Sequence, residues 1–173
     1  DNASIKLLIS ELVKLDQMYD VVIIDTGAGI TDSVMEFVMM SPEVVLVVTP
    51  EPTSITDSYS LLKVLRRKNS FNPLYKTIHV VANRVENENE GAEIFNKIDT
   101  VSSFLGAVLQ DKNASMAVIE QKPLIQAYPG TAATKGIHQL VTRLNDEQTE
   151  EYKKKEGIAR VFIDFFRSRK RIR

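Results

Sequence analysis

The stretch VVIIDTGAGI, residues 21–30, joins four β-branched apolar residues to an aspartate and a glycine-rich turn. Wholly apolar runs of this kind are typical of strands that are buried on both faces, as in parallel sheets. We therefore expect a strand over residues 21–25. Similar apolar runs over residues 44–48, 77–83 and 104–109 predict three more strands, of which we also expect 44–48 to be buried.

Segments of helical periodicity separate the expected strands. In residues 4–15, apolar side chains recur three and four positions apart, which indicates an amphipathic helix. Strands that alternate with helices form βαβ units with right-handed crossovers. The expected fold class is therefore α/β, with a doubly wound, mostly parallel sheet and flanking helices. The expected helices cover residues 4–15, 31–40, 54–68, 115–121 and 131–145, and one more bears Ile94, Phe95, Ile98 and Val101 after a polar loop at 86–90.

The amino-acid composition excludes some kinds of chemistry and shows an uneven distribution of charge. The chain has no cysteine, which excludes disulfides, thiol catalysis and cysteine-based metal sites and fits a cytoplasmic location. The net charge is −1, but it is unevenly distributed. Residues 153–173 hold nine Lys and Arg against two acidic residues, a net +7, so the first 152 residues carry −8. We expect an acidic body with a basic end.

The aspartate that ends the first apolar run is the main candidate for chemistry. In open α/β sheets, ligands bind at the carboxyl ends of the strands, where we expect Asp25 to lie. A carboxylate there suits Mg²⁺, which prefers hard oxygen ligands and keeps part of its hydration shell. Gly27 and Gly29 would let backbone N–H groups approach a phosphate. The pattern favours a nucleoside triphosphatase; the alternative is an aspartate that caps a helix, followed by a tight turn.

Several motifs together resemble one family. The stretch from residue 19 to residue 30 resembles the switch region of the MinD/ParA family of deviant-Walker P-loop ATPases, and the similarity extends over roughly residues 5–145. The amino-acid sequences of these motifs most resemble those of flagellar-number regulators of the FlhG/FleN type. The motifs that carry the resemblance are DTGAGI at 25–30, TPEPTSITDSY at 49–59, Asn83-Arg84, LGAV at 105–108, Lys122-Pro123-Leu124 and YPGTAATKGIHQL at 128–140.

This resemblance implies ATP and Mg²⁺ as cofactors and assigns roles to the glycine-rich turn. Asp25 would be the Walker B aspartate, which holds Mg²⁺ through water. Gly29 would donate its backbone N–H to the γ-phosphate, so that Asp25 and Gly29 form the catalytic pair. Gly27 would belong to the nucleotide-binding turn, although MinD itself has proline at this position, which makes the turn here more pliable.

The resemblance also implies roles for residues that follow the next two strands. Asn83 would contact the adenine edge, with Arg84 beside it, because an amide matches a donor and acceptor pair on the base. Glu51 and Asp57 would lie near a homodimer interface, where an acidic residue receives the signature lysine of the partner. Residues 109–111 depart from the pattern, since Leu-Gln-Asp replaces the usual proline-containing turn.

The family's phosphate-binding loop, Lys-Gly-Gly-x-Gly-Lys-Thr/Ser, is not found in the sequence. Residues 130–136, GTAATKG, contain some of its letters in the wrong order. We therefore expect the chain to be the C-terminal portion of a longer ATPase, with 1–145 as part of the ATPase domain. A naturally shortened homologue is the alternative. Without the loop, we expect this chain alone to be inactive and the full-length protein to be the enzyme.

The end of the chain has the profile of an interfacial membrane helix. After a polar linker at 146–157, residues 158–173 carry an apolar stripe at helical spacing, rimmed by basic side chains, and we expect them to bind anionic lipid. The alternative is a helix that docks on its own domain or on a partner. The expected membrane-binding residues are Ile158, Val161, Phe162, Phe165, Phe166, Arg167 and Lys170.

These features predict a MinD-like switch. An ADP-bound or empty monomer would become an ATP-bound dimer at the inner face of the cell membrane and would regulate flagellar number or placement, with flagellar assembly proteins as candidate partners. The alternatives are a ParA-type partition ATPase that binds DNA and a non-enzymatic adaptor. DNA is not an expected partner, because contacts with phosphate need no aromatic residues, whereas the basic tail carries three phenylalanines.

Overall fold

The computed structural model describes residues 11, 14–15, 17–67, 76–98 and 102–151, with side chains up to residue 145. The chain divides into two compact units. The first comprises Asp1–Val44, Lys63–Thr77 and Lys154–Arg173, and the second comprises Val45–Leu62 and Ile78–Lys153.

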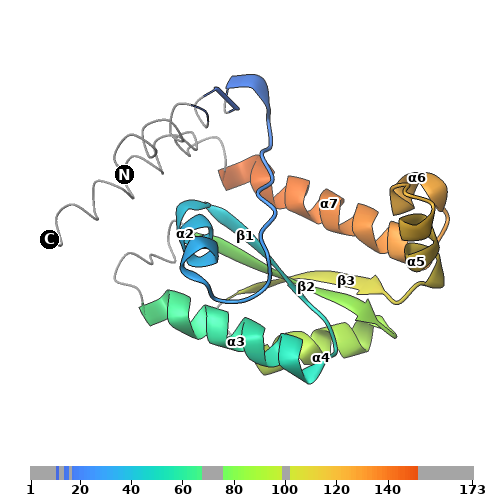
Figure 1. Ribbon diagram of the computed structural model, residues 1–173, viewed down its shortest axis with the longest axis horizontal. Helices are drawn as coiled ribbons and strands as arrows, with labels where there is room; N and C mark the ends of the chain where they lie inside the picture. Colours follow the sequence, from blue (N-terminus) through green and yellow to red (C-terminus); the bar gives the residue numbers. More distant parts are fainter. Residues whose placement is uncertain (1–10, 12–13, 16, 68–75, 99–101, 152–173) are drawn as a thin grey trace, which may run out of the picture. The chain divides into compact units, whose positions relative to one another are not determined.

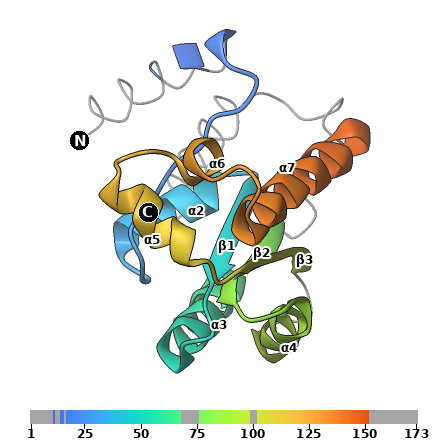
Figure 2. The same ribbon diagram turned by 90° about the vertical axis from the view of Figure 1, so that its right-hand side faces the viewer.

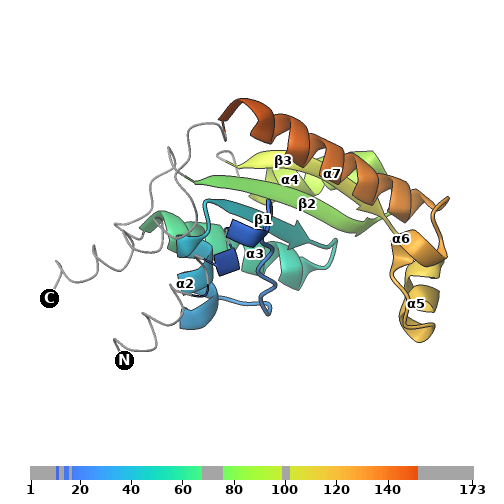
Figure 3. The ribbon, with the colours of Figure 1, turned by 90° about the horizontal axis from the view of Figure 1, so that it is seen from above.

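The described sheet has three strands in the order β1 (Glu43–Val48), β2 (Thr77–Val85) and β3 (Ser103–Leu109). Figures 1 and 3 show the strands side by side, with a helix between successive strands in the chain. β2 and β3 are parallel. The α/β fold and the strands expected at 44–48, 77–83 and 104–109 are therefore confirmed.

Helices cover both faces of this sheet in the second unit. α4 (Glu88–Ile98) packs on one face of β3, and α7 (Ala132–Glu151) packs on the other, as Figure 2 shows. α3 (Pro52–Arg67) follows β1, and its first residue is a proline, which suits the first turn of a helix because its missing N–H needs no partner there. α5 (Lys112–Ile119) and α6 (Leu124–Ala127) contact each other after β3.

Small, aliphatic and aromatic side chains fill the space between the sheet and these helices. On the α4 side, Phe95 stacks on Phe104 with ring centroids 5.3 Å apart, and Gly91 lies against the side chain of Ala107. On the α7 side, a continuous apolar cluster joins helix and sheet. Its members are Val81, Leu105, Val108 and Ala133, with Leu124, Ile137, Leu140 and Leu144 packed against them.

The first unit contains α2 (Asp32–Met40), which confirms the helix expected at 31–40. Its N-terminus is capped by Thr31, whose hydroxyl accepts a hydrogen bond from the N–H of Val34 at 3.4 Å. Its C-terminus is held by Lys76, which donates to the carbonyl oxygens of Val38 at 2.6 Å and of Ser41. A cation at this end also suits the helix dipole.

The strand expected at 21–25 is wrong. These residues have no strand structure, and Val21 and Ile23 are 60% and 87% exposed. An apolar run becomes a strand only when a neighbouring strand accepts and donates its backbone hydrogen bonds. The described part of the chain supplies no such neighbour for this segment.

β1 is correct as a strand but wrong as one that is buried on both faces. Val45 and Val47 are 46% and 53% exposed, whereas Val48 is fully buried. β1 forms an edge of the described sheet, so only part of its surface is covered. The apolar composition of the run does not distinguish an edge position from a central one.

Several helix boundaries differ from expectation. α4 begins at Glu88, inside the predicted polar loop, and α7 continues to Glu151, inside the predicted linker. α6 was not expected. Most of the predicted helix at 4–15 and all of residues 158–173 lie outside the described residues. None of the helices among the described residues combines the length and apolar character needed to cross a bilayer.

Candidate functional site

Side chains at the carboxyl ends of the three strands meet at one edge of the sheet in the second unit. Glu51 lies just beyond β1, Arg84 lies near the end of β2, and Gln110 directly follows β3. Nη1 of Arg84 lies 3.5 Å from Oε1 of Glu51, and Nε of Arg84 donates to Oε1 of Gln110 at 3.3 Å. The Arg84 guanidinium therefore joins residues from all three strand ends.

Arg84 has an unusual backbone. Its φ is +60°, in the left-handed region that residues with a Cβ rarely adopt. The residue falls at a shift in the β2–β3 register, between Asn83 opposite Val108 and Val85 opposite Leu109. Such bulges change the direction in which a side chain points, and a left-handed non-glycine residue costs about 1–3 kcal/mol. The backbone is therefore strained at the residue that carries this guanidinium.

Glu51 remains ionised under ordinary conditions. Its pKa is lowered, first by the Thr49 hydroxyl and by its own backbone N–H, and then by the charge of Arg84. The adjoining turn is also fixed, because the N–H of Thr49 donates to the hydroxyl of Ser54 at 3.0 Å. The carboxylate is a preformed acceptor for a cation.

The other residues predicted near this edge are placed as follows. Asn83 lies on β2 and is half-buried, next to Arg84. Asp57 lies on α3 and is exposed, whereas Glu51 precedes that helix. Contact of Asn83 with adenine and of Glu51 and Asp57 with a second copy remain predictions.

Asp111, which the sequence indicated only as part of a turn that departs from the family pattern, caps α5 at the same edge. Its Oδ1 accepts hydrogen bonds from the backbone N–H and the side-chain amide of Asn113, each at 2.9 Å, which caps α5. Its pKa is lowered, first by the Asn113 N–H and also by the Thr131 hydroxyl and the Ala133 N–H at the start of α7. The carboxylate therefore caps α5, and its surroundings favour its ionised form.

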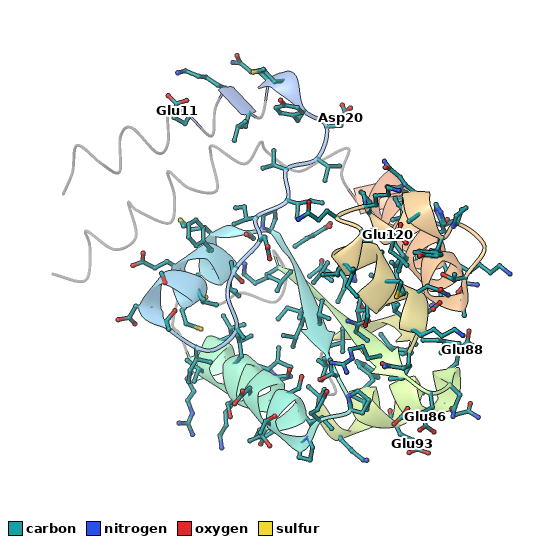
Figure 4. The ribbon with its side chains drawn as sticks, turned by 45° about the vertical axis from the view of Figure 1, so that its right-hand side comes forward. Glu11, Asp20, Glu86, Glu88, Glu93 and Glu120 are labelled. Atoms are coloured by element: carbon teal, nitrogen blue, oxygen red, sulfur yellow. The ribbon has the colours of Figure 1, made fainter. Side chains whose placement is uncertain are left out.

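The loop that follows β2 and the start of α4 are rich in acidic residues. Glu86 precedes α4, and Glu88 and Glu93 lie on it, as Figure 4 shows. The loop before the helix is ordered by its own side chains, since the N–H of Glu86 donates to Oε2 of Glu90 at 2.6 Å and the N–H of Glu90 donates to Oδ1 of Asn87 at 3.0 Å. Carboxylates in the first turn also suit the helix dipole.

The turn that carries Asp25 belongs to the first unit. Asp25 is exposed, and so are Gly27 and Gly29. Gly29 has a φ of +104°, and no atom lies within 4 Å of a Cβ built on either glycine. The turn therefore leaves open space around its backbone, and a side chain at position 29 would be strained.

Asp25 and the glycine turn fit a Mg²⁺ ion whose ligands are mainly water and phosphate oxygens. Among the described residues, no group of three or more His, Cys, Asp or Glu side chains could hold a metal. Mg²⁺ in nucleotide sites needs only one or two carboxylates, because phosphates and water complete the octahedron. The exposed carboxylate of Asp25, beside an open glycine turn, meets that requirement.

Two residues of the edge, Gln110 and Asp111, were missed as functional candidates. The signal was present, because both follow an apolar run, and the carboxyl ends of neighbouring parallel strands meet at one edge. The predicted membrane-binding residues, from Ile158 to Lys170, lie outside the described residues.

No family model matches the chain, but comparison with known sequences gives several relatives, among them FleN and YlxH. The chain is 35% identical to the antiactivator FleN of Pseudomonas aeruginosa over 135 residues, which cover 73% of this chain and 47% of FleN. It is 30% identical to the flagellum site-determining protein YlxH of Helicobacter pylori, over 70% of this chain and 42% of YlxH. The chain spans about half the length of the curated relatives it matches.

Solved structures show the same fold. The septum site-determining protein MinD of Pyrococcus horikoshii, complexed with Mg-ADP, matches 82% of this chain and 57% of that chain, with a TM-score of 0.65 and 19% identity. The cell division ATPase MinD of Pyrococcus furiosus matches 80% and 57%, with a TM-score of 0.61 and 21% identity.

Proposed function

Because this chain belongs to the MinD/ParA family, among its flagellar regulators of the FlhG/FleN type, we propose that the full-length protein is an ATPase that regulates flagellar number or placement. The observation that carries the proposal is the sequence similarity to FleN and YlxH, both matched over more than two thirds of this chain. The shared fold and the open aspartate–glycine turn support it.

In the proposed reaction, water attacks the γ-phosphorus of ATP, the bond to the β–γ bridging oxygen breaks, and ADP leaves while inorganic phosphate and a proton are released. Mg²⁺, when bound, would neutralise the charge that develops on the phosphate oxygens. Asp25 would hold the hydrated metal ion through its carboxylate. The backbone N–H of Gly29 would donate to the γ-phosphate, since the open turn admits a phosphate group. Asn83 would bind the adenine edge, with Arg84 beside it.

We further propose that ATP drives the formation of a homodimer at the inner face of the cell membrane. Glu51 and Asp57 would lie near the dimer interface, and the basic segment at 158–173 would bind anionic lipid. Two such segments in one dimer bind more strongly than one, because the second binds at a high effective concentration. ATP-dependent dimerisation would thus control attachment to the membrane.

The test uses the full-length protein, with ATP binding followed by calorimetry and hydrolysis by phosphate release. We expect Mg²⁺-dependent hydrolysis, and we expect Asp25→Asn to reduce the turnover by about 10²-fold or more while the protein still binds nucleotide. Asp32→Asn is a matched control, because Asp32 lies in the first turn of α2, after the glycine turn. A full-length protein that binds no ATP would contradict the proposal.

A further inference from the structure

Glu51 and Asp57 are the two acidic residues proposed to lie near the dimer interface, where the resemblance implies that a lysine of a second copy is received, and of these two Glu51 has a cation beside it. Nη1 of Arg84 lies 3.5 Å from Oε1 of Glu51 within the same chain. A lysine from a second copy and Arg84 would therefore compete for one carboxylate.

Two further observations show that the position of the Arg84 side chain beside Glu51 is fixed by the surrounding structure. Its Nε donates to Oε1 of Gln110 at 3.3 Å, so the guanidinium is fixed at a second point. Its backbone adopts φ +60° at the shift in the β2–β3 register, which is an independent observation. Left-handed residues of this kind occur where the surrounding structure imposes them, often at switch regions.

We propose that Arg84 is an intramolecular counter-ion that occupies Glu51 in the monomer, and that this pair opens when Glu51 binds a lysine of a second copy in the ATP-bound dimer. Gln110 is the positioning residue that holds Arg84 in place. The inference rests on the proposed function, because the dimer itself is part of that proposal.

The exposure of the pair sets the size of the effect. The side chains of Arg84 and Glu51 are 60% and 50% exposed, so water screens the pair and it opens readily. An exposed ion pair shifts an equilibrium by about two- to five-fold. A two-fold symmetric dimer contains two such exchanges, so the dimer dissociation constant should change by about four- to twenty-five-fold. The pair would act as a brake on dimerisation.

The experiment measures the dissociation constant of the full-length dimer by analytical ultracentrifugation, with a slowly hydrolysed ATP analogue at a concentration that saturates every variant. Arg84→Met should tighten the dimer by about four- to twenty-five-fold. Gln110→Leu changes no charge and should act in the same direction, with a smaller effect. Lys122→Met is the matched control, because it removes another exposed pair, 3.7 Å from Glu120, and should leave the constant unchanged.

A double variant separates the counter-ion role from a merely structural one. If Arg84 acts through Glu51, Arg84→Met should have no effect on dimerisation in a Glu51→Gln background. A dimer that is unchanged or weaker with Arg84→Met at saturating nucleotide would overturn the inference alone. If Arg84→Met does not fold, Gln110→Leu decides in the same way. A wild-type protein that binds no ATP, or binds it and stays monomeric, overturns the proposed function and this inference with it.

Discussion

A Cβ atom on Gly136 of α7 would lie 2.9 Å from the carbonyl oxygen of Ala107 in β3. The backbone of the helix thus rests directly on the backbone of the strand, and no flexible side chain lies between them that could move aside. This contact fixes the distance between α7 and the sheet, and it ties the YPGTAATKG motif to the third strand.

Gly136→Ala should therefore destabilise the chain. Overpacking costs about 1–3 kcal/mol, and the better helix propensity of alanine offsets up to about 1 kcal/mol. We expect a net loss of up to about 2 kcal/mol in the free energy of unfolding, measured by urea denaturation. Gly130→Ala is the control, because a Cβ at position 130 meets no atom within 4 Å. Equal stability of the two variants would contradict this interpretation of the contact.

Asp111 should contribute to the loss of stability in acid. Its pKa is lower in the folded chain than in the unfolded chain, chiefly because of the Asn113 N–H. The stabilisation is therefore complete above the unfolded pKa of about 4 and is lost as the pH falls through the lower, folded value. Asp111→Ala should lower the urea midpoint at pH 6, and its midpoint should fall less steeply than that of the wild type below pH 4. Parallel pH profiles for the two proteins would argue against this role.

The sequence was sufficient to predict the alternation of helices and strands, because most of the apolar runs and periodic segments lie in elements that local patterning determines. Prediction from the sequence failed where the structure depends on which strands pair with each other. The run at 21–25 has the composition of a strand, but a strand forms only beside a partner. The sequence also predicts that Val45 and Val47 are buried, whereas they are exposed, because composition does not reveal that β1 is an edge strand of the described sheet.

The candidate site divides in the same way. Asp25 and Asn83 could be proposed from the sequence because each lies at the end of an apolar run and matches a family motif, and their roles stay predictions. The contact between Arg84 and Glu51 accompanies a β-bulge and a left-handed backbone at Arg84. The local sequence pattern does not predict either feature. The lowered pKa of Asp111 depends in part on Thr131 and Ala133, about twenty residues later in the chain. Contacts between distant segments follow from the packing of the sheet and its helices.

Lys76 should give the chain a second pH dependence. Burial lowers its pKa from 10.5 to about 8, although the carbonyl oxygens of Val38 and Ser41 favour the charged form. Between these two values the unfolded chain binds a proton that the folded chain lacks, so stability rises with pH over this range and is lost as the pH falls back through 8. The full increment is at most about 3 kcal/mol.

The measurement compares unfolding free energies at pH 7.5 and 9.5 for the wild type and for Lys76→Met. The wild type should become more stable relative to the variant at the higher pH. Lys63→Met serves as a control with an exposed lysine on α3. A difference between wild type and Lys76→Met that stays constant with pH would show that Lys76 remains protonated in the folded chain.

The basic end of the chain offers the sharpest test of membrane binding. A peptide of residues 153–173 should bind vesicles that contain anionic lipid, because the phenylalanines insert and the basic residues approach the head groups. Phe165→Ala should weaken binding by about ten-fold or more, since burial of a phenylalanine contributes about 1.5–3 kcal/mol. Arg167→Ala should weaken binding by about five-fold on anionic vesicles.

Two comparisons distinguish this role from the alternatives. Ser168→Ala lies off the apolar stripe and should bind anionic vesicles like the unchanged peptide. On vesicles without anionic lipid, Arg167→Ala should make no difference, because the electrostatic attraction is then missing. A peptide that ignores vesicles but binds duplex DNA at the same salt concentration would favour partition-type activity, because binding to the phosphate backbone depends on charge and not on the aromatic stripe.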